Sequence, residues 1–180
     1  MPIQAPVEFT TARLLLRSPR ADDAVAIFER YASDPNVTRF LAWPRHLSLQ
    51  ETESFLQFSA REWERWPAGP YLILSLQSGE LLGSTGLAFD TLDHAITGYV
   101  LARKVWGQGF ATDALAAMVD VARRLNVARL SARCHTQHLP SQRVLEKCGF
   151  SRGGICEIDF PNLRPVRQQA FDYALRLDRR

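Results

Sequence analysis

Hydrophobic residues recur along the chain with two different spacings. In 21–33, 49–64 and 108–125 they return every three or four residues, which is the spacing of an amphipathic helix. A short fourth helix is predicted at 140–147, because Pro140 lies near its start and Gly149 just after its end. Apolar runs bounded by turn residues predict the strands 11–17, 71–76, 81–89, 96–101, 128–134, 150–158 and 168–177.

The order of these elements, β-αα-βββ-α-β-α-ββ, indicates the fold class. Turns at 78–79 and 90–93 separate three consecutive strands, as in an antiparallel meander. A chain of 180 residues is long enough for one domain with a substantial core. We therefore expect a single α/β (α+β) domain over 1–180, in which a mixed, mostly antiparallel sheet of about seven strands is flanked by about four helices.

The stretch 98–118 passes from a predicted strand through a glycine loop into a predicted helix. Gly107 and Gly109 let the backbone approach a ligand closely, and the free N–H groups at the helix start favour an anion such as phosphate. A tight turn that binds nothing explains a lone Gly-x-Gly equally well. The chain has Thr112 where a Rossmann site needs a third glycine, and no Lys-Ser/Thr pair follows Gly109 as a P-loop requires. Neither nucleotide motif fits.

Two segments resemble a known family. Lys104–Gly109 is similar to the Gln/Arg-x-x-Gly-x-Gly/Ala motif of the GNAT superfamily of acetyl-coenzyme A (acetyl-CoA) dependent N-acetyltransferases, with lysine at the first position. Segment 138–150 resembles Asn-x-x-Ser-x-Arg-Val-Leu-Glu-Lys-x-Gly-Phe, a signature of the GNAT branch that contains the Rim-type ribosomal-protein N-terminal alanine and serine acetyltransferases. Segments 11–17 and 171–175 are also similar to this branch, so the resemblance covers nearly the whole chain. It implies the GNAT fold and acetyl transfer to a primary amine by direct attack in a ternary complex.

The resemblance also implies where acetyl-CoA binds. The cofactor would enter where the strand 99–103 parts from the strand 128–134, because the amides of its pantetheine arm can pair with backbone groups that the parting strands leave free. The pyrophosphate would then lie on the amides of 107–112. The expected cofactor residues are Leu101, Arg103, Gly107, Gln108, Gly109, Phe110, Ala111, Thr112, His138, Ser141, Arg143 and Lys147.

The same resemblance assigns catalytic roles. A backbone N–H at or next to Leu101 would stabilise the charge that develops on the thioester oxygen. Leu145 occupies the position of a tyrosine that many GNAT enzymes use for the departing thiolate, so the resemblance favours Ser141 as the hydrogen-bond donor to the sulfur. A serine that only satisfies backbone groups at a helix start is the alternative. His138 replaces the asparagine of the signature, and it either contacts the cofactor, relays a proton or is a surface residue.

A general base is harder to find. The family often has a glutamate at the position of Ile96. Asp90, Asp93 and His94 are nearby in sequence, on the expected turn, and Asp90 is the candidate base. An α-amine has a pKa of ~7.7–8.0 and is partly neutral at physiological pH, whereas a lysine amine at ~10.4 is not. A site without a strong base therefore favours the α-amine of a protein or peptide N-terminus.

Aromatic residues in two loops would face the acceptor by analogy with the family. They are Phe40, Trp43 and His46 in the first loop and Phe160 in the second, where the whole segment 160–163 would face the acceptor. A peripheral hydrophobic cluster explains the same residues. A small amine such as a polyamine, amino acid or antibiotic is the alternative acceptor, and a non-catalytic acyl-CoA binding module is the alternative function.

Composition narrows the partners. The net charge of +3 is modest and no run of like charges occurs, so we expect no nucleic-acid partner. No apolar stretch is long enough for a bilayer and no leader pattern precedes 11–17, which predicts a cytoplasmic protein without a membrane partner. The 3 cysteines are expected as free thiols, and Cys134, His135 and His138 lack a fourth metal ligand. A homodimer agrees with the family, but no stripe of residues identifies an interface.

Overall fold

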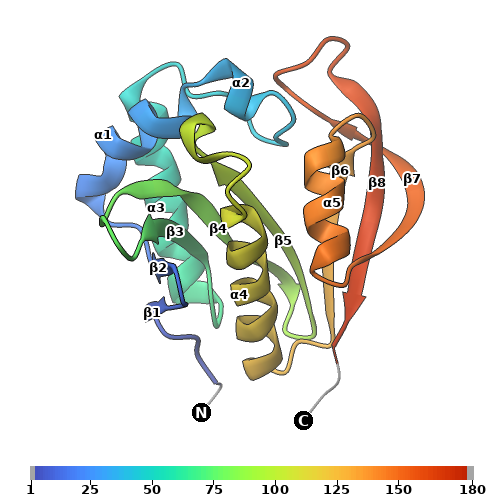
Figure 1. Ribbon diagram of the computed structural model, residues 1–180, viewed down its shortest axis with the longest axis horizontal. Helices are drawn as coiled ribbons and strands as arrows, with labels where there is room; N and C mark the ends of the chain where they lie inside the picture. The colour runs from blue at the N-terminus through green and yellow to red at the C-terminus, as the bar shows by residue number, and fades with distance from the viewer. Residues whose placement is uncertain (1–2, 178–180) are drawn as a thin grey trace.

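The strands of the protein form one continuous sheet in the order β1-β2-β3-β4-β5-β6-β8-β7, seen in a computed structural model that describes residues 3–177 (Figure 1). The strands are β1 (Glu8–Thr10), β2 (Leu14–Arg17), β3 (Pro70–Ser75), β4 (Leu81–Thr91), β5 (His94–Leu101), β6 (Arg129–His135), β7 (Ser151–Asp159) and β8 (Arg167–Arg176). The helices are η1 (Ala21–Asp23), α1 (Ala24–Ile27), η2 (Phe28–Ala32), α2 (Pro35–Thr38), α3 (Leu49–Arg65), η3 (Arg103–Val105), α4 (Phe110–Arg124) and α5 (Leu139–Lys147). Neighbouring strands are antiparallel apart from the parallel pair β5 and β6. The expected mixed, mostly antiparallel α/β fold is confirmed.

The N-terminal part holds the elements that the hydrophobic pattern misses. The pattern does not predict β1, and the expected strand 11–17 begins at Leu14 because Thr11 turns the chain, its hydroxyl accepting the Leu14 N–H at 3.1 Å. The described residues thus form 8 strands, not about seven. The expected helix 21–33 is divided into η1, α1 and the π-helix η2. The α2 turn lies in an expected loop, and the Asp34 carboxylate caps it by accepting the Asn36 N–H at 2.8 Å.

Helices cover both faces of the sheet. In Figure 1, α4 and α5 lie in front of the sheet and α3 behind it. The predicted apolar stripe of α4 is buried, including Leu115 and Met118 at 0% exposure. Each such side chain stabilises the fold by about 1.5–3 kcal/mol, so the stripe fixes α4 and the glycine loop before it. Among residues 3–177, no helix combines the length and hydrophobicity that a bilayer-spanning helix needs.

The parallel strands β5 and β6 part after a short pairing. Within the described chain they pair from His94↔Arg129 to Ile96↔Ser131. Beyond this point β5 stays paired with β4 up to Leu101, and β6 stays paired with β8 up to His135. The two strands therefore diverge along their C-terminal halves, as the resemblance implies.

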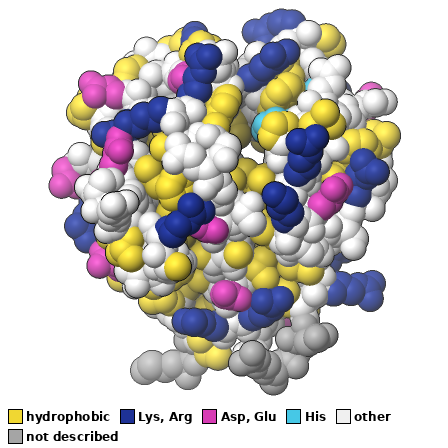
Figure 2. Space-filling model, viewed as in Figure 1, with side chains coloured by type: hydrophobic (Ala, Val, Ile, Leu, Met, Phe, Trp, Pro, Cys, Tyr) yellow, Lys and Arg dark blue, Asp and Glu magenta, His cyan; other side chains and the backbone are white. Residues whose placement is uncertain are grey.

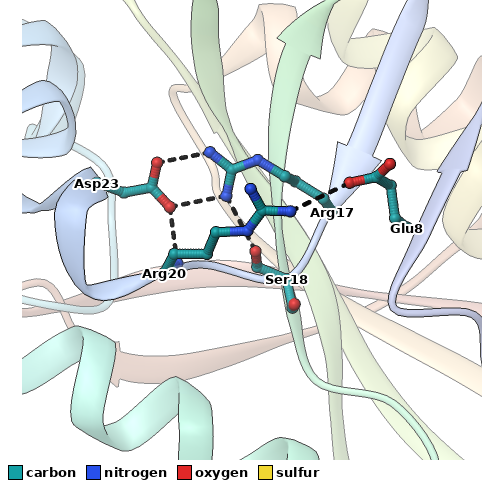
Figure 3. A network of polar contacts seen from close by, with 5 residues as sticks. All are labelled: Glu8, Arg17, Ser18, Arg20 and Asp23. Carbon is teal, nitrogen blue, oxygen red and sulfur yellow. Dashed lines mark hydrogen bonds and ion pairs between the residues drawn. The ribbon is translucent and has the colours of Figure 1, made fainter.

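A partly buried ion pair joins β2 to η1 (Figure 3). Arg17 donates to both carboxylate oxygens of Asp23, at 2.8 Å and 2.6 Å, and each side chain is 12% exposed. The backbone N–H of Arg20 donates to the same carboxylate at 2.7 Å. Burial by itself would raise the pKa of Asp23, but the hydrogen bonds from Arg17 and Arg20 outweigh it and lower the pKa. The carboxylate is therefore held in its charged form inside the fold.

Candidate active site

A cavity of about 490 Å³ opens beside the place where β5 and β6 part. Its walls come from the end of β5, the glycine loop, the start of α4, α5 and the α2 segment. The predicted cofactor residues that line it are Leu101, Gly107, Gly109, Phe110, Ala111, Thr112, His138, Ser141, Arg143 and Lys147. Figure 2 shows this face hollowed, with Lys and Arg side chains beside the hollow. The interior is largely apolar and the charged groups of its lining are basic.

The glycine loop has the backbone of an anion-binding turn. Gly107 and Gly109 have φ angles of 75° and 82°, in the left-handed region that favours glycine. Gly109 is the N-cap of the 15-residue helix α4, and no side chain of the described residues caps this end. The N–H groups of the first turn, at Phe110, Ala111 and Thr112, are left without intrahelical acceptors at the cavity wall. This arrangement suits a phosphate-sized anion.

Arg13 holds the loop from the other side. Its guanidinium donates to the Gln108 carbonyl at 3.1 Å and to the Asp113 carboxylate at 2.7 Å, and it lies 4.6 Å from the centre of the Phe110 ring. Asp113 is the acidic residue in the first turn of α4, where its charge would repel a bound anion. Arg13 neutralises that charge and fixes the loop. Sequence reasoning missed this residue, although it lies in the segment 11–17 that is similar to the Rim-type branch.

Lys104, at the variable first position of the glycine motif, points away from the cavity. Its ammonium group pairs with Glu80, which also pairs with Arg30. Hydrogen bonds from Lys104 and then Arg30 lower the pKa of Glu80 to about 2. The predicted residues Arg103 and Gln108 do not line the cavity, and the Gln108 amide donates to the Lys104 carbonyl at 3.3 Å.

Ser141 lies in the first turn of α5 and lines the cavity. Its side chain does not cap the helix. Instead its hydroxyl oxygen lies 2.9 Å from the hydroxyl of Tyr99 on β5. Tyr99 also lines the cavity, and burial raises the pKa of its phenol, so the group stays protonated. Sequence reasoning placed Tyr99 only as a strand residue.

His138 closes one end of the cavity against Phe40. The two rings are stacked, with centres 4.8 Å apart. Burial, with a smaller contribution from His135, lowers the pKa of His138 to about 4. The imidazole is therefore neutral near pH 7, where it can form hydrogen bonds but is a weak base.

A titration experiment tests this placement. An unfolded histidine takes up a proton below pH 6.5, whereas folded His138 does so only near pH 4, so wild-type stability should fall as the pH drops through this window. Asn does not titrate. We expect His138→Asn to have a lower melting temperature than the wild type at pH 7, because the stacking is lost. Between pH 7 and pH 4.5, however, its melting temperature should fall by a few degrees less than that of the wild type. If calorimetry shows the same fall in melting temperature for the wild type and for His138→Asn, the buried, neutral state of His138 is contradicted.

A family model covers most of the chain. The family described as "Acetyltransferase (GNAT) domain" matches residues 13–151. The chain belongs to the GNAT acetyltransferase family. Among curated proteins it is similar to "Uncharacterized N-acetyltransferase p20" of Bacillus licheniformis, with 28% identity over 150 residues, 81% of this chain and 83% of the relative.

Solved GNAT structures share the fold. RimL, named a ribosomal L7/L12 alpha-N-protein acetyltransferase and solved with coenzyme A, superposes with a TM-score of 0.82 at 24% identity, covering 96% of this chain and 97% of that one. MccE, a microcin C7 self-immunity acetyltransferase solved with acetyl-CoA and AMP, gives 0.81 at 19% identity and covers 93% and 94%. At this level of identity the likeness establishes the fold.

The predicted acceptor residues of this GNAT domain divide into two groups. Phe40 lines the cavity, while Trp43 and His46 pack on each other outside it, with ring centres 5.2 Å apart. Phe160 is 2% exposed and packs edge-on against His135. The last three are thus core or peripheral contacts.

Asn162 joins the two loops that carry these aromatic residues. Its amide donates to the carbonyls of Thr38 and Trp43, at 2.8 Å and 2.9 Å, and its oxygen accepts the Arg45 N–H at 2.8 Å. Asn162 belongs to the segment 160–163 that is expected on the acceptor side, but no sequence signal identifies its linking contacts.

Asp90 lies outside the GNAT cavity. It is exposed in β4, one residue before the end of that strand and not in the turn, and so lies near the start of β5, at the opposite end from Leu101. Its carboxylate pairs with His94 at 2.8 Å, and His94 is 2.8 Å from the Ser131 hydroxyl. Of the described residues, those lining the cavity include no aspartate or glutamate. The structure therefore does not bring the predicted base to the site.

Proposed function

We propose that this protein is an acetyl-CoA-dependent N-acetyltransferase that acts on the α-amine of a protein or peptide N-terminus. The observation that carries the proposal is the cavity, which has an anion-binding helix start, basic residues at Arg143 and Lys147, an apolar interior and, among its described lining residues, no carboxylate. Such a cavity fits a ligand with an apolar arm and a phosphate-rich end. RimL, named as an enzyme of this kind, was solved with coenzyme A and supports the cofactor.

In this proposal each residue has a separate role in acyl transfer. Bound acetyl-CoA supplies the thioester. The backbone of β5 near Leu101 faces the gap left by β6, where a ligand amide can pair with it, and the Leu101 carbonyl already accepts the Trp106 indole N–H at 2.8 Å, which leaves one lone pair. Ser141 donates a hydrogen bond to the departing sulfur. His138 stays neutral and orients polar groups beside Phe40.

The absence of a carboxylate from the described lining favours the α-amine. Such an amine, with a pKa of ~7.7–8.0, is already partly neutral at pH 7, so it can attack without a strong base. A polyamine carries several positive charges and would gain little in a cavity whose charged residues are basic. An N-terminus of a cytoplasmic protein is the acceptor class that we infer.

A small, flat amine is the second candidate. The stacked pair Phe40 and His138 offers a planar wall at the cavity, and aromatic walls bind small planar molecules well. The similar structure MccE is named as an enzyme of antibiotic self-immunity.

The test is thiol release from acetyl-CoA in the presence of short peptides with Ala, Ser or Met N-termini, compared with polyamines, amino acids and aminated antibiotics. We expect the highest kcat/KM with peptides, and we expect Ser141→Ala to lower kcat about 100-fold with little change in KM for acetyl-CoA. Ser54→Ala is the matched control, because the Ser54 hydroxyl only donates to the Gln50 carbonyl on the exposed face of α3.

Other outcomes identify the alternatives. If thiol is released from acetyl-CoA with small amines but not with peptides, the acceptor is a small molecule and not a protein N-terminus. Tight binding of acetyl-CoA without release for any amine would indicate a binding module.

A further inference from the structure

Three side chains from neighbouring strands form a row of hydrogen bonds outside the cavity. The carboxylate of Asp90 on β4 lies 2.8 Å from Nδ1 of His94 on β5, and Nε2 of His94 lies 2.8 Å from the hydroxyl of Ser131 on β6. None of these three residues lines the cavity. In Figure 1 the turn from β4 to β5 is at the lower end of the sheet, away from the start of α4. The row is therefore separate from the proposed acetyl-transfer site.

The carboxylate fixes the tautomer of the neutral imidazole. The hydrogen bond from His94 holds the pKa of the Asp90 carboxyl below its usual value, so this group is ionised near pH 7 and can only accept. Nδ1 of His94 then carries the imidazole proton, and the lone pair of Nε2 accepts from the Ser131 hydroxyl. A carboxylate, an imidazole and a hydroxyl in this order are the groups that activate a serine for nucleophilic attack.

A bulge in β4 brings the carboxylate to the imidazole. The register between β4 and β5 shifts between Phe89 and Thr91, which leaves Asp90 as the extra residue, with its side chain against His94. Bulges commonly redirect a side chain in this way. The Asp90 side chain is 57% exposed and that of His94 27% exposed, so a small molecule can reach the row from solvent.

The surroundings of Ser131 suit a small acyl group. In the sheet register this half-buried residue lies between Ile96, which is 40% exposed, and Ala174. Arg129 is exposed and lies two positions earlier on β6, so it shares the face of Ser131. A short acyl chain can pack on the apolar side chains, and the guanidinium brings positive charge near the place where an oxyanion would form.

We propose that Ser131 is the nucleophile of a second site, at which the protein hydrolyses short-chain carboxylic esters. The Ser131 oxygen bonds to the ester carbonyl carbon while its proton passes to Nε2 of His94. The bond from that carbon to the leaving alkoxide then breaks, and the alkoxide takes the proton from His94. Water repeats these steps on the acyl-serine, which releases the carboxylic acid and restores the Ser131 hydroxyl. This activity is independent of the proposed acetyl transfer.

A fluorophosphonate probe tests the nucleophile, because it labels serines that a neighbouring base activates. We expect mass spectrometry of the digested protein to place the label on Ser131. Asp90→Asn should lower the labelling rate about 100-fold, because the amide can donate to Nδ1 and so moves the imidazole proton to Nε2. Asp120→Asn is the matched control and should leave the rate unchanged, since Asp120 is also exposed and pairs with Arg123 on α4 at 3.1 Å.

Hydrolysis of p-nitrophenyl butyrate measures the complete reaction. We expect the wild type to release nitrophenolate about 100-fold faster than Ser131→Ala. Thiol release from acetyl-CoA should be the same in both proteins, whereas Ser141→Ala should lose thiol release and keep ester hydrolysis. This opposite pattern separates the second site from the acetyl-transfer site.

Three results would overturn the second site. They are the absence of label on Ser131, equal labelling rates in the wild type and Asp90→Asn, and equal ester hydrolysis by the wild type and Ser131→Ala. A wild type that hydrolyses the ester through Ser131 but acetylates no amine would overturn the proposed acetyltransferase function and support the second site.

Discussion

Gly83→Ala should lower the free energy of unfolding by about 4 kcal/mol or more, a large part of the about 5–15 kcal/mol that stabilises a typical domain. Gly83 lies on β4 opposite Leu101, at the end of the strand that lines the cavity. A Cβ atom there would overlap the Val100 carbonyl oxygen and lie 2.9 Å from the Leu101 Cα. Because these are backbone atoms, no side-chain rotation relieves the overlap, and β4 must move away from β5.

Urea denaturation measures this effect, and Gly98→Ala is its control. Gly98 pairs with Gly86 on the same two strands, but an added Cβ would meet nothing within 4 Å. We expect the control to change stability by less than about 0.5 kcal/mol. Equal, small effects of both substitutions would show that the strands adapt to the methyl group. Because Gly83 holds Leu101 in place, any folded fraction of Gly83→Ala should also bind acetyl-CoA more weakly.

Arg17→Met should lower the free energy of unfolding by about 3–5 kcal/mol, because it leaves the Asp23 carboxylate charged and 12% exposed, with the Arg20 N–H as the donor that still reaches it (Figure 3). Asp23→Asn added to this variant should recover much of the loss, since the amide carries no charge and can still accept the Arg20 N–H. Arg20→Met is the control. Its ion pair with Glu8 spans 3.4 Å between side chains 62% and 49% exposed, so we expect a cost below about 1 kcal/mol.

The pH dependence gives a second readout. In the wild type the pKa of Asp23 is lowered, so its stabilisation is present above the unfolded value of ~3.9 and is lost as the pH falls through the lower folded pKa. Without Arg17 the burial that remains should raise the folded pKa above the unfolded one, which favours folding as the pH falls. The stability difference between wild type and Arg17→Met should therefore shrink from pH 7 to pH 4. A constant difference would contradict an ionic cause.

The sequence predicts those parts of the site that depend on neighbours along the chain. The glycine loop and α4 follow from glycines and an apolar stripe within 107–125. Arg13 and Asn162 escape such reasoning, because their partners Gln108 and Thr38 are 95 and 124 positions away. Only the folded sheet brings these residues together.

Asp90 shows the opposite case, a residue that is near the site in sequence but far from it in the fold. It is close in sequence to Tyr99, but an extended strand rises ~3.3–3.4 Å per residue. The 8-residue strand β5 therefore puts roughly 24 Å between its two ends. Sequence reasoning missed the contact of Tyr99 for a different reason, because its hydroxyl meets Ser141, 42 positions later in the chain.

Because β5 pairs with β6 over a short stretch, the stability of the sheet should depend on bound acetyl-CoA. A pantetheine arm lying between the diverging strands would form hydrogen bonds where β5 and β6 no longer pair, and would so link strands β1–β5 to strands β6–β8. A ligand present at 100 times its Kd adds about 2.7 kcal/mol to the stability of the folded state. The cellular lifetime of such a protein would then follow the acetyl-CoA supply, so that the enzyme persists when its acetyl donor is plentiful and is cleared sooner when the donor is scarce.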